Sequence, residues 1–513
     1  MSIAALIKKL QDIMRKDPGV DGDVQRLNQF VWMIFLMVYD YKEEENELDD
    51  NYAPVIPIGY RWRDWANPLN DNGEPDLKNQ LTGDELISFV DTRLMPVLKG
   101  NAINVDGKQI VPFERNDDRA LLVKQVMGDA TNLMKSGYFL REVINLFNEV
   151  DLSQTNDSHE FSEMYEGLLD GLQAMGKYGE FHTVKAITEF SIDKVNPKLG
   201  ETVADWACGT GGFLVDAVEK LRKQVRLGHN EDFYQLQKSI IGGEFKPMPY
   251  RLCITNMLLH GIDMPNIRYG DSLDYKNFSE YYGEDLVDVA CLNPPYGGVA
   301  SDSDKLAFPA DMRSSETADL FVALTVKRLK KNGRAVVVVP DGFLFGNDNA
   351  KVAIKKYLLK ECNLHTIIRL PQSCFAPYTS IATNLLFFEK TGSTSETWFY
   401  RLDMPNGYKH FSKTKPMKRH HFQPVDEWWI NRIEIMDDKA HEDVSDTYKA
   451  KKYTVDVFAN NYYNLDLCGY PVEEKQILSP EETIKTYIEK REALDKEMDS
   501  KLNEILQLLG VGQ

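Results

Sequence analysis

Over the first third of the chain, apolar residues recur at the three- and four-residue spacing of amphipathic helices. This spacing runs through residues 3–14, 27–38, 86–97 and 123–134, and it would place one apolar stripe on each helix. The segment 43–76 is polar and contains four prolines, which predicts a long irregular connection. Within this connection, we interpret Trp62 and Trp65 as core anchors rather than ligand contacts, because large aromatic side chains usually pack inside. The pattern predicts a helical domain over residues 1–165.

After about residue 164 the pattern changes to short apolar runs that alternate with helical segments. The runs predict strands at 203–205, 239–244, 267–271, 287–292, 334–339, 364–370 and 383–389. Between them, helices are predicted at 212–223, 250–260 and 317–329. Repeated strand–helix units of this kind favour an α/β fold with a largely parallel sheet and helices on both faces. We assign this domain to residues 166–430.

The remaining residues, 431–513, end in a long amphipathic helix. Ser479 is placed to cap its first turn, Pro480 stands at the first helical position, and Glu482 completes a capping box. Apolar residues then follow at helical spacing as far as Leu509, and Gly510 ends the pattern. Such a helix would pack either on its own domain or on a partner helix, and its length favours a partner.

Composition restricts the partners of the chain. The 513 residues carry a formal net charge of −19, which argues against sequence-independent DNA binding by the chain alone, since phosphate contacts need Lys and Arg. A local basic surface remains compatible with this charge. The run 408–421, YKHFSKTKPMKRHH, has five Lys or Arg and three His but no acid. It is either a solvated loop or a contact for phosphates or a partner.

Several classes of site and location are not expected. The six cysteines form no close C-x-x-C pair, which indicates a reducing compartment and no zinc site. The longest apolar run, 30–39, is too short to cross a bilayer and fits a buried helix. The first residues lack a secretory cleavage pattern. We therefore expect a cytoplasmic location and no membrane association.

The first candidate site is the stretch DWACGTGGFL, residues 205–214. An apolar run, an acid, a glycine-rich turn and a helical pattern follow one another, and such a turn at a strand end is where open α/β sheets bind nucleotides. By themselves, glycines after a strand indicate only a turn. Gly209 and Gly211 fit the first two glycines of the dinucleotide-binding spacing G-x-G-x-x-G, but Gly212 does not fit the third. Asp205, Glu244 and Asp271 each end a predicted strand, and they would either line one crevice or cap the following helices.

The second candidate is Asn293-Pro294-Pro295-Tyr296, which follows the apolar run 286–292. A ligand-cradling turn after one strand and an NPPY tetrapeptide after another fit a methyl-transfer enzyme.

These segments carry a family resemblance. YGEFHT, DWACGTGGFL, GGE, GDSL, CLNPPYGG, TADLFVALTVKRLKKNGRAVVVVPDG and FAPYTSIATNLLFF resemble, in the same order, the modification (methyltransferase) subunits of type I restriction–modification systems. The resemblance extends from about Lys177 to Lys390. Trp206 stands where these subunits usually have Pro, and His182 and Val184 stand where an aromatic residue and Pro are usual.

The resemblance implies a Rossmann-like class I methyltransferase domain that moves a methyl group from S-adenosylmethionine to N6 of a flipped-out adenine in DNA. The amine of adenine is a poor nucleophile because its lone pair is delocalised into the ring. Asn293 and Pro294 would accept its two hydrogens, and the two prolines would stiffen the turn. Tyr296 would stack on the extruded base, with Phe375, or Tyr378 in its place, on the other face.

The resemblance also implies a set of cofactor-binding residues. Glu180, Phe181, His182, Thr183, Val184 and Lys185 would close over the methionine end, and Asp205, Ala207, Cys208, Gly209, Thr210, Gly211, Gly212 and Phe213 would cradle the rest. Glu244 would accept hydrogen bonds from the ribose hydroxyls, and Asp271, with Ser272 beside it, would contact the adenine amine.

The leading hypothesis is a modification subunit that acts on DNA with a separate DNA-specificity subunit, because no block between the motifs is large enough for a target-recognition domain. A second copy of the chain and a nuclease subunit are further candidate partners. Three alternatives remain open: a self-sufficient adenine methyltransferase, an NPPY enzyme that methylates glutamine in a protein, and a non-catalytic scaffold.

Overall fold

A computed structural model of the chain describes residues 3–70, 72–76, 78–113, 117–149, 183–376, 379, 381–437 and 448–467, with scattered positions between 487 and 501. The chain separates into one unit, Met1–Asp438 with Asp446–Gly469, and a second, Lys439–Ser445 with Tyr470–Gln513. The helix predicted from Ser479 lies largely outside the described residues. The fold below is that of the first unit.

The N-terminal part is helical, as its apolar spacing predicts. Its helices are α1 (Ile3–Met14), α2 (Asp23–Asn46), α3 (Trp62–Trp65), α4 (Gly83–Phe89), η1 (Val90–Leu94), α5 (Met95–Leu98), α6 (Asp118–Met127) and α7 (Gly137–Asn148). The apolar run 30–39 lies in α2 and is buried throughout, which confirms its interpretation as a buried helix. Trp62 and Trp65 are 5% and 3% exposed, so both are core anchors as predicted.

One element of this part was not predicted. Strands β1 (Ile103–Val105) and β2 (Lys108–Ile110) form an antiparallel hairpin. Asp106 and Gly107 connect them with φ angles of 53° and 79°, the left-handed geometry that an Asp-Gly turn adopts. The two strands carry no buried residues, so the apolar pattern gives no signal for them.

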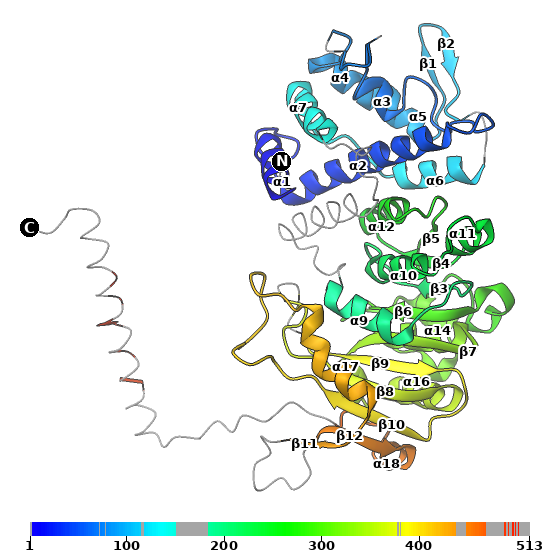
Figure 1. The fold of residues 1–513 in the computed structure, drawn as a ribbon, viewed down its shortest axis with the longest axis vertical. Coiled ribbons are helices and arrows are strands. Elements are labelled where there is room, and N and C mark those ends of the chain that lie inside the picture. Colours follow the sequence, from blue (N-terminus) through cyan, green and yellow to red (C-terminus); the bar gives the residue numbers. More distant parts are fainter. Residues whose placement is uncertain are drawn as a thin grey trace, which may run out of the picture. The chain divides into compact units, whose positions relative to one another are not determined.

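The second part is built on a ten-stranded sheet (Figure 1). Its strands are β3 (Val203–Asp205), β4 (Ile240–Glu244), β5 (Asn266–Tyr269), β6 (Val287–Leu292), β7 (Leu329–Pro340), β8 (Asn363–Arg369), β9 (Thr383–Glu389), β10 (Glu396–Arg401), β11 (Ile435–Met436) and β12 (Tyr448–Thr454). Their order is β11-β12-β10-β8-β9-β7-β6-β3-β4-β5. Strands β5, β4, β3, β6 and β7 are parallel neighbours, and β9 is antiparallel to both β7 and β8. All seven predicted strands are present, and the α/β fold with a largely parallel sheet is confirmed.

The sheet continues further than the sequence pattern indicates. Strand β10 pairs parallel with β8 and antiparallel with β12, and β11 completes the edge. Residues on both sides of position 430 therefore belong to one sheet. The domain bounds 1–165, 166–430 and 431–513 stay a prediction.

Helices cover both faces of the sheet. They are α9 (Lys185–Val195), α10 (Gly212–Arg222), α11 (Asn230–Gln237), α12 (Pro247–Leu259), α13 (Asp302–Ala307), α14 (Thr317–Arg328), α15 (Asp341–Phe345), α16 (Asn349–Glu361), α17 (Gln423–Ile430) and α18 (Val455–Asn460). Alternate residues of a strand enter different cores. For example, Val336 and Val338 pack with α9, α10 and α12, whereas Val337 and Val339 pack with α14 and α16. This is the two-residue period expected of a sheet buried on both faces.

Helix α12 joins the sheet to the N-terminal helices, because it packs against α2 and α6 (Figure 1). The Arg251 Nε donates to the carbonyl of Val126 at 2.8 Å, and the Tyr250 hydroxyl donates to Gln125 Oε1 at 3.3 Å. The N-terminal helices are thus packed on the helix that follows β4, next to the predicted site.

Strand β3 lies between β4 and β6, so the chain leaves β3 toward one side of the sheet and later returns to the other. Ligands of open α/β sheets bind at the carboxyl ends of strands at such a switch point. Elsewhere, the five described cysteines are buried and free. Among the described helices none has the length and apolar character needed to cross a bilayer.

Candidate active site

A cavity of about 570 Å³ lies at the carboxyl ends of β3, β4, β5 and β6. The predicted site residues that line it are Thr183, Ala207, Cys208, Gly209, Gly212, Phe213, Glu244, Asp271, Ser272, Asn293, Pro294, Pro295, Tyr296 and Phe375. Among the described residues, five predicted ones do not line it: Val184, Lys185, Asp205, Thr210 and Gly211. Glu180, Phe181, His182 and Tyr378 lie outside the described residues. The cavity therefore brings together both candidate motifs.

The glycine-rich turn after β3 depends on its glycines. Gly209 and Gly211 have φ angles of 55° and 90°, in the left-handed region that favours glycine. A Cβ on Gly211 would also lie 3.0 Å from the Cys253 sulfur. Gly211 precedes the first residue of α10, so the unpaired N–H groups of that helix start beside the cavity. The predicted order of strand, turn and helix is confirmed.

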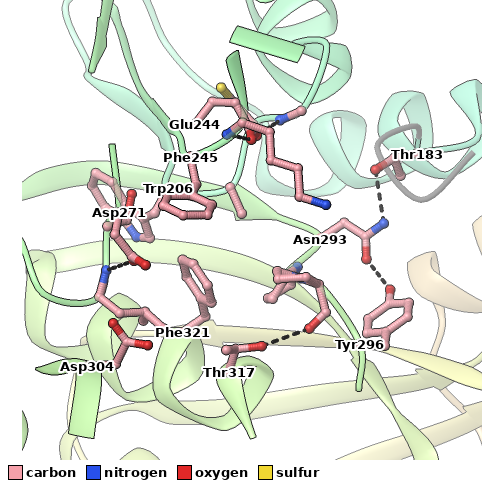
Figure 2. Close-up of a pocket in the computed structure, with 18 of the residues that line it drawn as sticks. Thr183, Trp206, Glu244, Phe245, Asp271, Asn293, Tyr296, Asp304, Thr317 and Phe321 are labelled. Atoms are coloured by element: carbon pink, nitrogen blue, oxygen red, sulfur yellow. Dashed lines mark hydrogen bonds between the residues drawn. The ribbon is translucent and has the colours of Figure 1, made fainter. Parts of the chain in front are cut away.

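Glu244, the last residue of β4, is held by backbone donors. Its Oε2 accepts from the N–H of Gly209 at 2.9 Å, and its Oε1 accepts from the N–H of Lys246 at 2.7 Å. Burial raises the pKa of the carboxyl, and the two backbone hydrogen bonds act against that rise. Each oxygen keeps a second lone pair for a ligand, and the carboxyl lies at the cavity wall (Figure 2).

Asp205 has a different position from Glu244, although both end a strand. Its side chain is 1% exposed, and its Oδ1 accepts from the N–H of Ala207 at 3.0 Å. Burial raises the pKa of this carboxyl to about 8. Asp205 therefore supports the turn from beneath, and two of the three strand-end acids, Glu244 and Asp271, line the cavity.

Asp271 lies two residues beyond β5. Its Oδ1 accepts from the N–H of Leu273 at 2.9 Å, and burial raises the pKa of the carboxyl. Its carboxyl approaches those of Asp274 and Asp304, all within 4.8 Å of one another. Acidic groups at this spacing are common without an ion, and we assign no metal to them.

The NPPY turn begins directly after β6 and is held on two sides (Figure 2). The Asn293 Nδ2 donates to the Thr183 hydroxyl at 3.1 Å, and the Tyr296 hydroxyl donates to Asn293 Oδ1. On the other side, the Thr317 hydroxyl donates to the carbonyl of Pro295 at 3.1 Å. The amide of Asn293 thus has a defined orientation, with its oxygen toward Tyr296.

The rings of Tyr296 and Phe375, which both line the cavity, contact each other edge-on. Their ring centroids are 6.4 Å apart and their planes make an angle of 77°, whereas two rings that sandwich a base must lie parallel to it. The Tyr296 hydroxyl also donates a hydrogen bond to the side-chain oxygen of Asn293. In this arrangement the two rings cannot sandwich a planar base between them.

Sequence reasoning did not assign several residues that line the cavity. Trp206 and Phe321 form apolar wall, and Asp304 lies beside Asp271 (Figure 2). The Oδ1 of Asp304 is buried and has no hydrogen-bond partner among the described residues. Phe321 stands in the apolar pattern of the helix 317–329, and Asp304 forms a capping box with Ser301 at the start of α13, so the local pattern of each residue indicates helix structure rather than a site. Trp206 was distinguishable as a departure from the family pattern.

Comparisons with known proteins agree with this geometry. The model of the N-6 DNA Methylase family matches residues 156–477. The chain is 44% identical over 508 residues to the type I restriction enzyme EcoEI methylase subunit of Escherichia coli, covering 99% of this chain and 98% of that protein. It is 29% identical over 446 residues to the EcoKI methylase subunit of Escherichia coli K12, covering 83% and 75%.

Solved structures show the same similarity. The modification subunit of a suggested type I restriction enzyme from Vibrio vulnificus is 36% identical, with a TM-score of 0.75, and the match covers 93% of this chain and 98% of that one. A chain from a structural study of complex assembly in the type I R-M system is 30% identical, again with a TM-score of 0.75, over 100% and 99% of the two chains.

Proposed function

We propose, from the premise that this chain belongs to the N-6 DNA methylase family, that its cavity holds S-adenosylmethionine and a target adenine side by side. The family model matches most of the chain, and a relative 44% identical over its whole length is a type I restriction enzyme methylase subunit. The chain is thus an adenine-specific DNA methyltransferase subunit of the type I class. The proposal concerns which of its residues hold each reactant and which partners it needs.

The observation that carries the proposal is the position of Asn293 in the same cavity as Glu244 and the turn at Gly209. The methyl group of the cofactor and the adenine amine that receives it would then meet within one cavity. The volume of about 570 Å³ lies in the range of small-molecule sites, roughly 300–1,000 Å³. Holding two reactants in line supplies a large part of the rate of such a transfer.

We call the part of the cavity lined by Glu244, Asp271 and the turn at Gly209 the cofactor half. Its residues fit S-adenosylmethionine, whose sulfonium supplies an electrophilic methyl group when bound. Glu244 would accept hydrogen bonds from the ribose hydroxyls with its remaining lone pairs. Asp271 would accept from the adenine amine, and the buried, unpaired Oδ1 of Asp304 is a second acceptor on that wall. Ala207, Cys208, Gly209, Gly212, Phe213 and Ser272 line the same half, with Thr183 at its boundary with the NPPY turn.

We call the part of the cavity lined by Asn293, Tyr296 and Phe375 the base half. Its residues fit an amine that donates hydrogen bonds. The Asn293 Oδ1 and the Pro294 carbonyl would accept the two N6 hydrogens of adenine, which favours a more tetrahedral nitrogen with an available lone pair. An adenine inside a duplex cannot reach these acceptors, so it must be flipped out and stacked. Tyr296 and Phe375 would hold its two faces after Tyr296 releases Asn293.

We propose that a separate DNA-specificity subunit delivers the DNA, since a net charge of −19 disfavours DNA binding by the chain alone. A second copy of the chain and a restriction subunit would complete the assembly, which we place in the cytoplasm. A relative known from the study of type I complex assembly supports this organisation.

Transfer of a labelled methyl group tests the function. The full chain is incubated with labelled S-adenosylmethionine and unmodified DNA, with and without a DNA-specificity subunit. We expect label in the DNA as N6-methyladenine only when both subunits are present. Label in DNA with the chain alone would indicate a self-sufficient enzyme, and label in added protein a glutamine methyltransferase. Failure to bind S-adenosylmethionine would indicate a scaffold and overturn the proposal.

A further inference from the structure

The basic loop, defined here as Tyr408–His421, presents a cluster of cations on the surface. Lys409, Lys413, Lys415 and Lys418 are all exposed, and the loop contains no Asp or Glu. Arg419 differs from these lysines because it forms ion pairs with Asp426 at 2.6 Å and Asp193 at 3.1 Å. The arginine therefore attaches the loop to the domain, while the four lysines are exposed at its surface.

The loop has a fixed shape despite its polar sequence. Phe411 and Met417 are 1% and 4% exposed, so two side chains anchor it in the core. Between these anchors, Ser412 and Lys415 form an isolated bridge with two backbone hydrogen bonds of 3.1 Å. Tyr408 packs against the rings of Phe411 and His421. A loop that was only solvated would need no such anchors.

The anchor places the loop beside the base half of the cavity. The N–H of Phe411 donates to the Ser373 hydroxyl at 2.9 Å, and Ser373 stands two residues before Phe375. Phe375, Thr379 and Ile381 from the same segment line the cavity. The cations are thus attached to the wall that carries the predicted base-stacking residue.

The other basic cluster of the chain, residues 327–334, provides a contrast. It lies at the amino end of β7, at the opposite edge of the sheet from the NPPY turn. There Lys330 is paired with Asp288 and Arg334 with Glu201, each at 2.8 Å. These cations are neutralised by acids of the same domain, whereas the sequence of the basic loop supplies no acid.

We infer that the basic loop binds backbone phosphates of the DNA strand next to the flipped-out adenine. The inference rests on the proposed function. Flipping leaves the phosphates on either side of the base at the mouth of the cavity, where exposed lysines attached to its wall can meet them. Lysine contacts to phosphate position DNA without reading its sequence. In a chain of net charge −19, such a local surface would reduce the repulsion of the approaching strand.

The test compares two charge-matched variants of the full chain assembled with its specificity subunit. Lys409→Gln/Lys415→Gln removes two charges from the basic loop. Lys331→Gln/Lys360→Gln removes two exposed charges from the opposite edge of the sheet and serves as the control. Methyl transfer to a DNA fragment that the wild-type complex modifies is measured against DNA concentration and salt. The affinity for S-adenosylmethionine is measured separately.

We expect the loop variant to raise the KM for DNA about tenfold and to lower the salt-dependence slope by about two, since each phosphate contact contributes roughly 0.9. The kcat at saturating DNA and the affinity for S-adenosylmethionine should remain those of the wild type and of the control. An unchanged KM and slope would overturn the inference. Loss of the specificity subunit from the variant on gel filtration would overturn it in favour of a protein contact. A wild-type complex that transfers no methyl group to DNA would instead contradict the proposed function.

Discussion

The two halves of the cavity are held together by different kinds of contact. In the cofactor half, backbone N–H groups of Gly209, Lys246 and Leu273 hold the carboxyls of Glu244 and Asp271. In the base half, side chains hold side chains, because Thr183 and Tyr296 both bind the amide of Asn293. Backbone contacts follow from the fold and change only with it, whereas side-chain contacts can be exchanged by rotation. The cofactor half is therefore held by the fold itself, whereas in the base half the rings of Tyr296 and Phe375 would have to turn before they could sandwich a base.

Removal of the Asn293 amide should separate the two halves most clearly, because it should lower the rate of transfer and leave cofactor binding unchanged. We expect Asn293→Ala to lower kcat at least about 100-fold, the scale for losing a hydrogen bond made to the reacting group, while the affinity for S-adenosylmethionine stays within about twofold. Single-turnover methyl transfer and calorimetric titration measure the two quantities. Asn293→Asp, which keeps an oxygen acceptor, should retain part of the rate. A parallel loss of rate and cofactor binding would mean that the two halves are not separable.

The cofactor half is tested at Glu244. Glu244→Gln replaces one acceptor oxygen by an NH₂ group, which cannot accept from the N–H of Gly209 or Lys246 or from a ribose hydroxyl. We expect the Kd for S-adenosylmethionine to rise about 30-fold, with kcat at saturating cofactor within about twofold. Glu231→Gln, on the exposed surface of α11, is the control. An unchanged Kd would remove Glu244 from the proposed site.

Thr183 tests whether the base half depends on side-chain positioning. The Thr183 hydroxyl accepts from the Asn293 amide at 3.1 Å, so Thr183→Val should free the amide and lower kcat about tenfold, near the worth of one hydrogen bond. Thr183→Ser keeps the hydroxyl and should restore the rate. A residue that only contacts the cofactor would change the KM for S-adenosylmethionine instead, and equal defects in both variants would exclude the positioning role.

The smallest expected effect concerns stability and pH. The pKa of Asp205 is about 8 in the fold because of burial, above its ordinary value near 4. The unfolded chain therefore loses this proton first as pH rises, and Asp205 makes folding less favourable between pH 4 and pH 8. Asp205→Asn keeps an oxygen for the N–H of Ala207, so we expect an unchanged Tm at pH 4 and a Tm a few degrees higher at pH 8. Equal shifts at both pH values would contradict the assignment.

The sheet shows how far local pattern predicts a fold. Strands β6 and β9 lie within the predicted bounds because each contains a short run of apolar residues between turn residues. Strand β12 has the sequence YKAKKYT, in which only Ala450 is buried. Such a lysine-rich strand lies near the edge of a sheet, where charges prevent further pairing, and its own sequence does not distinguish it from a loop.

The sequence alone determined the α/β fold, the turn at Gly209–Gly212 and the NPPY turn, because each is specified by residues that are neighbours along the chain. Only the tertiary structure decided that Glu244 lines the cavity while Asp205 lies beneath it, since both are acids at strand ends. It also decided that Tyr296 occupies the oxygen of Asn293 and that Thr183, 110 positions away in sequence, orients the same amide. The direction of a side chain and its distant partners depend on how the strands pack, and spacing along one chain carries no record of that packing.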